Sequence, residues 1–221
     1  MKITVAMITM NEEGAIAKVV GDIKRCVPGA EILVVDSSKD RTPEIAESLG
    51  CRVIRQFPPK GYGKAMDLAL RSGTGDVVVT LDCDDTYPTD AISEMIHWIE
   101  QGYDVVNASR LQRRPEAMPI PNYVANLVFA GATFLVHGLM TTDDHSGMRA
   151  YRKSMIDQLD WDPAGAALPV ELLILPHRKG FKIKDIGIDY RERIGTSTLQ
   201  KWDSTKATFR RIFKLRLVRK D

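Results

Sequence analysis

Two acidic side chains in the sequence follow an almost continuous apolar run. Asp82 and Asp84 come directly after residues 77–81, which read Val-Val-Val-Thr-Leu. Residues two apart on a strand face the same way, so both carboxylates are expected on one side of the chain. Close carboxylates repel each other unless a proton or cation lies between them, and Mg²⁺ and Mn²⁺ prefer oxygen ligands. The spacing favours a divalent-metal site over the alternative, a solvated turn that caps a helix beginning near Thr89.

Further polar side chains stand where other strands are expected to end. In open α/β sheets, ligands bind beyond the carboxyl ends of the strands, so these residues are candidates for the same site. Three of the four strand ends carry carboxylates, which is typical of a metal that bridges protein acids and a diphosphate. The four ends are Thr9-Met10-Asn11-Glu12, Asp36-Ser37-Ser38, Asp82-Cys83-Asp84-Asp85 and Ser109-Arg110.

The elements that must position these residues alternate between strand and helix. Apolar runs bounded by Gly, Pro and Asp predict strands, and longer segments of helical periodicity predict the helices between them. This order predicts an α/β fold with a Rossmann-like, doubly wound, mostly parallel sheet. The expected strands are 3–9, 31–35, 51–54, 76–81 and 103–108, and the expected helices are 15–26, 42–50, 64–71 and 91–101.

The composition is that of one globular domain. The chain has 221 residues, of which 44% are hydrophobic and 27% charged, and its net charge of +2 gives no field that favours nucleic acid. We therefore expect no nucleic-acid partner. Cys26, Cys51 and Cys83 form no CxxC pair, and no secretory signal precedes the first strand, which together indicate a reducing, cytoplasmic location.

Taken in order, these motifs resemble the family 2 glycosyltransferases of the GT-A fold, and among them the dolichyl-phosphate (polyprenyl-phosphate) hexose synthases. The resemblance spans roughly residues 3 to 200. Its departures are Ser37, where a second acid is usual, and Thr198, where many members have Lys. The motifs that carry it are Thr9–Glu12, Val34–Thr42, Gly61–Ala65, Asp82–Asp84, Ser109–Arg110, Asp143–Arg152 and Tyr190–Ser197.

The resemblance implies a nucleotide-sugar donor bound at the strand ends. Glu12 and Asp36 would accept hydrogen bonds from the base and the ribose. Asp82 and Asp84 would hold Mg²⁺ or Mn²⁺ on the donor diphosphate, with Thr86 as a further metal contact. The residues implied in donor binding are Thr9, Asn11, Glu12, Asp36, Lys64, Asp82 and Arg110.

The resemblance also implies contacts to phosphate groups. Arg110, Arg149 and Arg193 would grip phosphate oxygens, because a guanidinium offers a fixed fork of donors. Asp143 would either touch the acceptor or orient Arg149. An acceptor that is already a phosphate dianion needs no general base. The residues implied in catalysis are Asp84, Asp143, Arg149 and Arg193.

Two segments suggest contact with a membrane surface. Residues 117–142 contain no Asp, Glu, Lys or Arg, but prolines and polar residues argue against a spanning helix. We expect a membrane-interface helix here, flanked by Arg113 and Arg114; a buried helix packed on the sheet is the alternative. Residues 206–220 carry seven basic residues and no acid, which favours an amphipathic surface anchor over a helix that only closes the domain.

These observations lead to one hypothesis with two alternatives. Residues 1–200 form a GT-A domain and 201–221 a basic amphipathic segment. The enzyme transfers a hexose, with inversion, from GDP-mannose or UDP-glucose to a polyprenyl or dolichyl phosphate, and it is peripheral on the cytoplasmic face of a membrane. The alternatives are a soluble transferase with a saccharide or small hydroxyl acceptor, in which Asp143 or Asp144 is the general base, and a non-catalytic subunit that recruits partners to a membrane.

Overall fold

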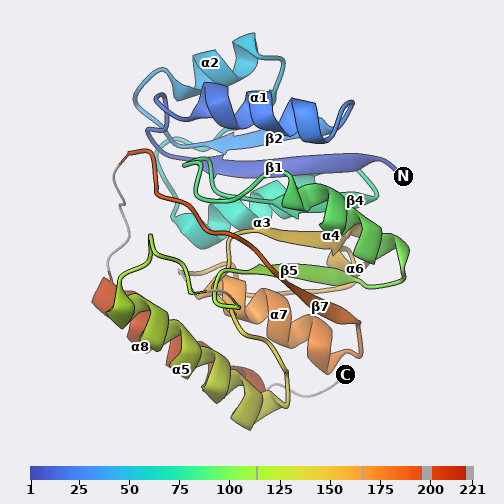
Figure 1. Cartoon of the computed structure of the whole chain (residues 1–221), viewed down its shortest axis with the longest axis vertical. Coiled ribbons are helices and arrows are strands. Elements are labelled where there is room, and N and C mark those ends of the chain that lie inside the picture. The colour runs from blue at the N-terminus through green and yellow to red at the C-terminus, as the bar shows by residue number, and fades with distance from the viewer. Residues whose placement is uncertain (113, 166, 196–200, 218–221) are drawn as a thin grey trace.

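A mixed seven-stranded sheet forms the centre of the protein in the computed structural model, which describes residues 1–112, 114–165, 167–195 and 201–217 (Figure 1). The strand order is β3-β2-β1-β4-β6-β5-β7. Arg113, Thr198 and residues 218–220, which entered the sequence hypotheses, lie outside the described residues. The strands are β1 (Ile3–Thr9), β2 (Glu31–Asp36), β3 (Arg52–Arg55), β4 (Val77–Thr80), β5 (Val105–Ser109), β6 (Arg149–Arg152) and β7 (Ile183–Gly187).

Helices cover both faces of this sheet, which separates two apolar cores. One core lies under α1, α2 and α4, and the other lies under α3, α6, α7 and part of α8. The alternation predicted for the first half of the chain is confirmed, and β1 has the predicted bounds. The helices are α1 (Ile16–Cys26), α2 (Thr42–Ser48), α3 (Tyr62–Ser72), α4 (Ala91–Glu100), α5 (Ile120–His137), α6 (Lys153–Ile156), α7 (Leu168–Arg178) and α8 (Lys201–Leu217).

Strand β6 runs against the direction of its neighbours. It pairs antiparallel with β4 and with β5, whereas β1 pairs parallel with β2 and β4, and β5 pairs parallel with β7. The segment that precedes β6 therefore lies at the same edge of the sheet as the ends of β4 and β5. This reversal brings residues 143–148 beside the acids that follow β4.

Helices α5 and α8 pack side by side beyond this edge of the sheet (Figure 1). Ile212 and Leu215 of α8 are 0% and 3% exposed, so α8 belongs to a core of the domain. Helix α8 thus packs on the domain through these two side chains, and the expected domain boundary at residue 200 stays a prediction. In the described part of the chain, no helix is long and apolar enough to span a bilayer.

Helix α5 buries one stripe, packs Ala132 and Val136 partly against a core, and exposes the large apolar side chains of its other side. Phe129, Ala130 and Thr133 are buried. The exposed apolar side chains of α5, two exposed side chains of α8 and one side chain from the turn after α5 form a surface that we call the apolar face. Its members are Ile120, Val124, Leu127, Val128, Phe134, Leu135, Met140, Phe213 and Leu217.

Candidate active site

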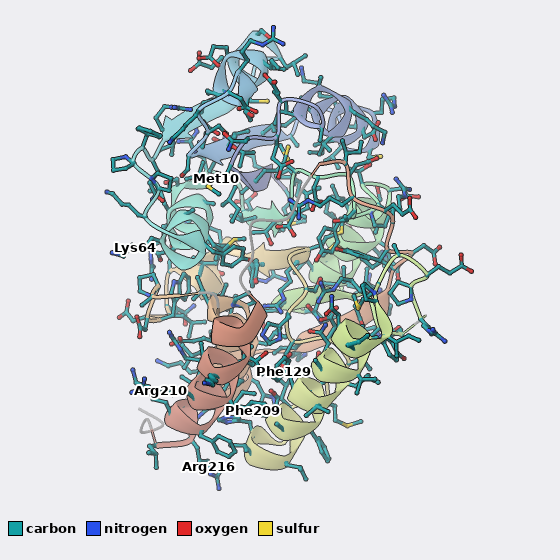
Figure 2. All side chains as sticks on the ribbon, turned by 90° about the vertical axis from the view of Figure 1, so that its left-hand side faces the viewer. Met10, Lys64, Phe129, Phe209, Arg210 and Arg216 are labelled. Carbon is teal, nitrogen blue, oxygen red and sulfur yellow. The ribbon has the colours of Figure 1, made fainter. Side chains whose placement is uncertain are left out.

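A cavity of about 360 Å³ lies at the carboxyl edge of the sheet. Figure 2 looks toward this side of the molecule, with Met10 after β1 and Lys64 on α3 above Phe129 of α5 and Phe209 of α8. The residues that line the cavity come from the loop after β4, the segment after β5, the segment before β6, the segment after β7, and helices α3, α5, α7 and α8. Among the predicted site residues, the lining contains Asp82, Asp84, Arg110 and Arg193.

The two acids after β4 have different surroundings. Oδ1 of Asp84 accepts hydrogen bonds from the hydroxyl and amide of Thr86, at 2.6 and 3.2 Å. No hydrogen bond to Asp82 is formed within the described ranges. Burial and the neighbouring Asp84 carboxylate raise the pKa of Asp82 above its ordinary value. Thr86 is buried and outside the cavity lining, so the structure makes it a support for Asp84, in place of the expected direct metal contact.

Arg193 joins the acids after β4 to the loop after β1. Its guanidinium lies 3.0 Å from Oε1 of Glu12 and 3.2 Å from Oδ2 of Asp84. Burial raises the pKa of Glu12 to about 7; Arg193 opposes this rise and Asp84 adds to it. Backbone bonds hold the arginine in place, since the amide of Ile194 donates to the carbonyl of Asp84 at 2.9 Å. Glu12, Asp82 and Asp84 thus form an acidic group beside one guanidinium.

A second arginine is held by a buried carboxylate. Nε and Nη2 of Arg110 donate to the two oxygens of Asp143 at 2.7 and 2.9 Å, and the Arg110 amide adds a bond of 3.1 Å. The Asp143 side chain is 0% exposed and that of Arg110 is 13% exposed. Burial alone would raise the pKa of Asp143, but Arg110 outweighs it and holds this pKa below its ordinary value. Asp143 therefore positions Arg110, and not Arg149 as one alternative proposed.

The structure does not fit the predicted phosphate contact of Arg149. This side chain is 1% exposed and is absent from the cavity lining among described residues. Its Nε donates to Asn107 at 2.8 Å, its Nη2 donates to the Asp144 carbonyl at 2.9 Å, and its Nη1 donates to the Pro169 carbonyl. These protein acceptors make Arg149 a brace between β6, the loop before it and α7.

The predicted base-binding edge is organised around a carboxylate that is itself covered. Asp36 is 0% exposed and accepts hydrogen bonds from the hydroxyls of Thr9 and Ser38, at 2.7 and 2.5 Å, and from Arg55. A direct bond from Asp36 to a base or ribose, as expected from the sequence, does not fit this surrounding. Its contacts instead fix the positions of Ser38 and Arg55 at the ends of β2 and β3.

Two other residues of the predicted donor set lie near the surface. Asn11 adopts a positive φ of 61° and its Oδ1 accepts the amide of Lys39 at 2.9 Å, so it shapes the loop after β1. Lys64 is exposed in the first turn of α3 and, among described residues, does not line the cavity (Figure 2). The donor set is therefore gathered along one edge of the sheet, without forming a single contiguous pocket.

Two lining residues belong to a motif of the family resemblance but were not predicted as site residues. His145 and Gly147 precede β6, and a Cβ atom on Gly147 would lie 2.8 Å from Oδ2 of Asp82, closer than real side chains approach. The Gly147 amide donates to the Tyr87 hydroxyl at 2.8 Å. The sequence offers no reason to place His145 and Gly147 beside the acids after β4, because this proximity depends on the antiparallel course of β6.

Two acids and their surroundings fit a divalent cation that also binds a diphosphate. Within the described part of the chain no donor hydrogen-bonds to the Asp82 carboxylate, and Asp82 and Asp84 both line the cavity. In the described ranges no cluster of three or more His, Cys, Asp or Glu side chains could hold a metal ion alone. A hard cation bound here would take its remaining oxygen ligands from a substrate or from water.

The comparisons with known proteins define the class of this enzyme. The chain belongs to glycosyltransferase family 2, because the model described as "Glycosyl transferase family 2" matches residues 4–160. The sheet and its flanking helices are those of the GT-A fold, as the resemblance implied.

Relatives in this family narrow the class to a hexosyltransferase. The chain is 41% identical over 214 residues to a dolichyl-phosphate hexose transferase of Haloferax volcanii, covering 96% of this chain and 93% of that protein. It is 30% identical over 186 residues to a dolichol-phosphate mannosyltransferase of Pyrococcus furiosus, covering 79% of this chain and 53% of that longer protein. The predicted enzyme class is confirmed, and the alternative of a non-catalytic subunit is wrong.

The solved structures support the fold. Glucosyl-3-phosphoglycerate synthase of Mycobacterium tuberculosis, in complex with phosphoglyceric acid, superposes with a TM-score of 0.75 at 23% identity, over 96% of this chain and 77% of that one. Another structure of that enzyme contains Mn²⁺, UDP-glucose and glycerol 3-phosphate and gives a TM-score of 0.72 at 24% identity, with the same coverage.

Proposed function

We propose that this hexosyltransferase transfers its sugar, with inversion and with Mg²⁺ or Mn²⁺, from a nucleotide sugar to a polyprenyl or dolichyl phosphate. The observation that carries the proposal is the composition of the one cavity that contains the acid pair. One end has Asp82, Asp84 and Arg193, and the other is lined by α5 and α8. A charged diphosphate and the phosphate head of a lipid-linked acceptor can therefore meet in one space, beside the two helices that carry the apolar face.

The apolar face supports a lipid-linked acceptor. Leu135 and Leu217 are 83% and 85% exposed, and the other members of this face lie on the same two helices, apart from Met140 in the turn after α5. Exposed apolar surface of this extent marks contact with a membrane or another molecule. Lys206, Arg210 and Arg216 are exposed on α8 beside it, as a surface with anionic lipids requires. We propose that the enzyme binds the cytoplasmic face of a membrane peripherally through this face.

The surroundings of two buried acids favour a phosphate acceptor over a hydroxyl. A saccharide acceptor needs a general base, for which Asp143 and Asp144 were the candidates. Asp143 is bound on both oxygens by Arg110, and Asp144 is bound by Thr133 at 2.8 Å and His145 at 2.7 Å. Both acids are 0% exposed, so neither reaches a substrate hydroxyl. A phosphate dianion needs no such base.

The acid pair would hold the metal. Asp82 and Asp84 would supply carboxylate oxygens, and the bound metal would neutralise charge on the departing diphosphate. Arg193 would bind the same diphosphate, and Arg110, fixed by Asp143, would bind phosphate on the acceptor side. In this scheme Glu12 keeps Arg193 in place and Thr86 keeps Asp84 in place.

The donor is proposed to be GDP-mannose or UDP-glucose. The Pyrococcus relative is named for mannose transfer, and UDP-glucose is bound in the mycobacterial structure, which belongs to a more distant protein. The resemblance to the dolichyl-phosphate synthases favours mannose.

One assay tests the proposal. The protein is incubated with each radiolabelled nucleotide sugar and Mn²⁺ or Mg²⁺, with and without polyprenyl phosphate, and the product is extracted into organic solvent. We expect labelled lipid only when both the lipid phosphate and the metal are present, and excess EDTA should abolish it. Transfer to a soluble sugar without lipid phosphate would instead support the saccharide transferase.

A further inference from the structure

A hydrogen-bonded chain of three side chains closes the end of the cavity near α5 and α8. Nδ1 of His145 lies 2.7 Å from Oδ1 of Asp144, and Nε2 lies 2.9 Å from the hydroxyl of Thr208 on α8. Both His145 and Thr208 line the cavity. The other oxygen of Asp144 accepts the hydroxyl of Thr133 on α5 at 2.8 Å. Two adjacent loop residues, Asp144 and His145, thus connect both helices of the apolar face to the site.

The orientation of the imidazole follows from its partners. An ionised carboxylate only accepts hydrogen bonds, so Nδ1 of His145 carries the proton shared with Asp144. The ring of Phe129 packs on the imidazole with 5.0 Å between the ring centroids. It also packs on the ring of Phe209, with 5.1 Å between the centroids. Nε2 and the Thr208 hydroxyl are therefore held at fixed positions on the cavity wall.

The distribution of basic side chains in the cavity indicates that His145 and Thr208 bind a phosphate group. The basic side chains among its described lining residues are Arg110, His145 and Arg193. Arg193 is committed to the acids on the donor side, and Arg110 is paired with Asp143. A second phosphate group bound by Arg110 on the acceptor side would therefore also meet His145, the basic lining side chain that is hydrogen-bonded to α8.

We propose that His145 and Thr208 bind the phosphate group of the acceptor, a phosphate monoester attached to a lipid chain; this rests on the proposed function. A phosphate oxygen would receive hydrogen bonds from Nε2–H and from the Thr208 hydroxyl, while Nδ1–H stays on Asp144. Because Nδ1–H is held by Asp144, the Nε2–H donor requires one further proton, taken up from solvent or from the acceptor phosphate as it binds, and the resulting imidazolium offsets part of the phosphate's charge. Asp144 is then a positioning residue for His145.

The test compares variants of the pair with a matched histidine outside the cavity. His145→Leu removes the donor, His145→Gln keeps an N–H, and Thr208→Val removes the hydroxyl at nearly constant shape. His137→Gln is the control, because Nε2 of His137 also links α5 to α8, at 2.8 Å from the Ile212 carbonyl, but His137 is outside the described lining. The readouts are the dissociation constant for a short-chain prenyl phosphate, that for the nucleotide sugar, and the acceptor KM.

We expect His145→Leu and Thr208→Val to weaken prenyl-phosphate binding and raise the acceptor KM by about 10- to 100-fold, the range for a lost bond to a charged group. His145→Gln should lose less, and His137→Gln should resemble wild type. Donor affinity should be unchanged in all four. Inorganic phosphate, tested alone, should bind more weakly than the prenyl phosphate if the site serves a lipid-linked group.

A measurement on the wild-type protein covers the case in which a variant does not fold. In ¹⁵N-histidine NMR spectra, assigned with His145→Gln, the Nε2 resonance of His145 should shift on addition of prenyl phosphate and not on addition of the corresponding prenyl alcohol. An unshifted resonance at saturating prenyl phosphate overturns the proposal.

Two outcomes separate this proposal from the function on which it rests. If wild type makes labelled lipid and His145→Leu binds prenyl phosphate as tightly as wild type, only the His145–Thr208 site is wrong. If wild type neither binds prenyl phosphate nor forms labelled lipid, both fail. An Asp–His pair can also act as a general base; loss of transfer to a soluble hydroxyl in His145→Gln would assign that role and overturn ours.

Discussion

The ion pair of Arg110 and Asp143 offers a direct test of how the site is held together. Replacing Asp143 by Leu leaves the Arg110 guanidinium, whose side chain is 13% exposed, without the carboxylate that accepts two of its hydrogen bonds and one from the Arg110 amide. Removing one partner of a buried pair costs about 3–5 kcal/mol in the free energy of unfolding. For a chain of this size, that corresponds to a fall of about 6–20 °C in the melting temperature.

The double variant Arg110→Met with Asp143→Leu separates stability from catalysis. An apolar pair of similar volume replaces a buried ion pair at little cost or with a gain, so the double variant should recover most of the lost stability. It should not recover transfer, because Arg110 lines the cavity and its side chain is proposed to bind acceptor phosphate. Urea unfolding followed by circular dichroism gives the free energies, and the lipid-extraction assay gives the rates.

The pH dependence of stability gives an independent check. Because Arg110 depresses the pKa of Asp143 in the folded state, the pair's contribution is present above the unfolded pKa of an aspartate, about 4, and is lost as the pH falls through the lower folded value. Wild type should therefore lose more stability on acidification than the double variant. An Asp143→Leu protein as stable as wild type at neutral pH would refute the reasoning.

Four further outcomes follow from the site and the apolar face. Asp84→Ala should lower transfer on the order of 100-fold or more with the fold retained, whereas Asp85→Asn, whose carboxylate pairs with a surface lysine, should not; equal rates would exclude the metal role. Because the pKa of Asp82 is raised, Mn²⁺ affinity measured by electron paramagnetic resonance should increase from about pH 5 to pH 8. Asp36→Ala should reduce the unfolding free energy by about 1–3 kcal/mol and weaken nucleotide binding in calorimetry, since buried hydroxyls lose their acceptor. Leu135→Ser, at a position 83% exposed, should weaken sedimentation with anionic liposomes by about tenfold and leave the melting temperature unchanged; the reverse pattern would mean that this residue packs inside the protein.

The part of the fold that could be predicted is the part with regular signals. Residues 3–9 alternate in a strand pattern and form β1 with those bounds. Strand β6 gave no such signal, because Arg149–Arg152 is short and carries an arginine at each end. Helix α7 is buried along most of its length and contains Pro169 and Pro176, so it shows little amphipathic periodicity.

The candidate site likewise has a part that could be predicted from the sequence and a part that could not. The acids at the ends of β1, β2 and β4 were found because parallel strands deliver their carboxyl ends to one edge. The hydrogen-bonded pairs of the site were not predicted, since Arg110 and Asp143 are separated by 33 residues and His145 and Thr208 by 63. The sequence does not show that the Arg149 guanidinium donates its hydrogen bonds to Asn107 and to backbone carbonyls.

The reversed strand β6 also has a consequence for how acceptor choice can change. Since β5 and β6 are adjacent and antiparallel, everything from Arg110 to Met148, including α5, is one enlarged hairpin loop that leaves and re-enters the sheet at neighbouring positions. Such a loop can be lengthened, shortened or exchanged without altering the register of β1, β2 and β4, which carry the donor-side acids. The middle of this loop can therefore vary, whereas its last residues are constrained by the donor side, because Gly147 lies directly against the Asp82 carboxylate.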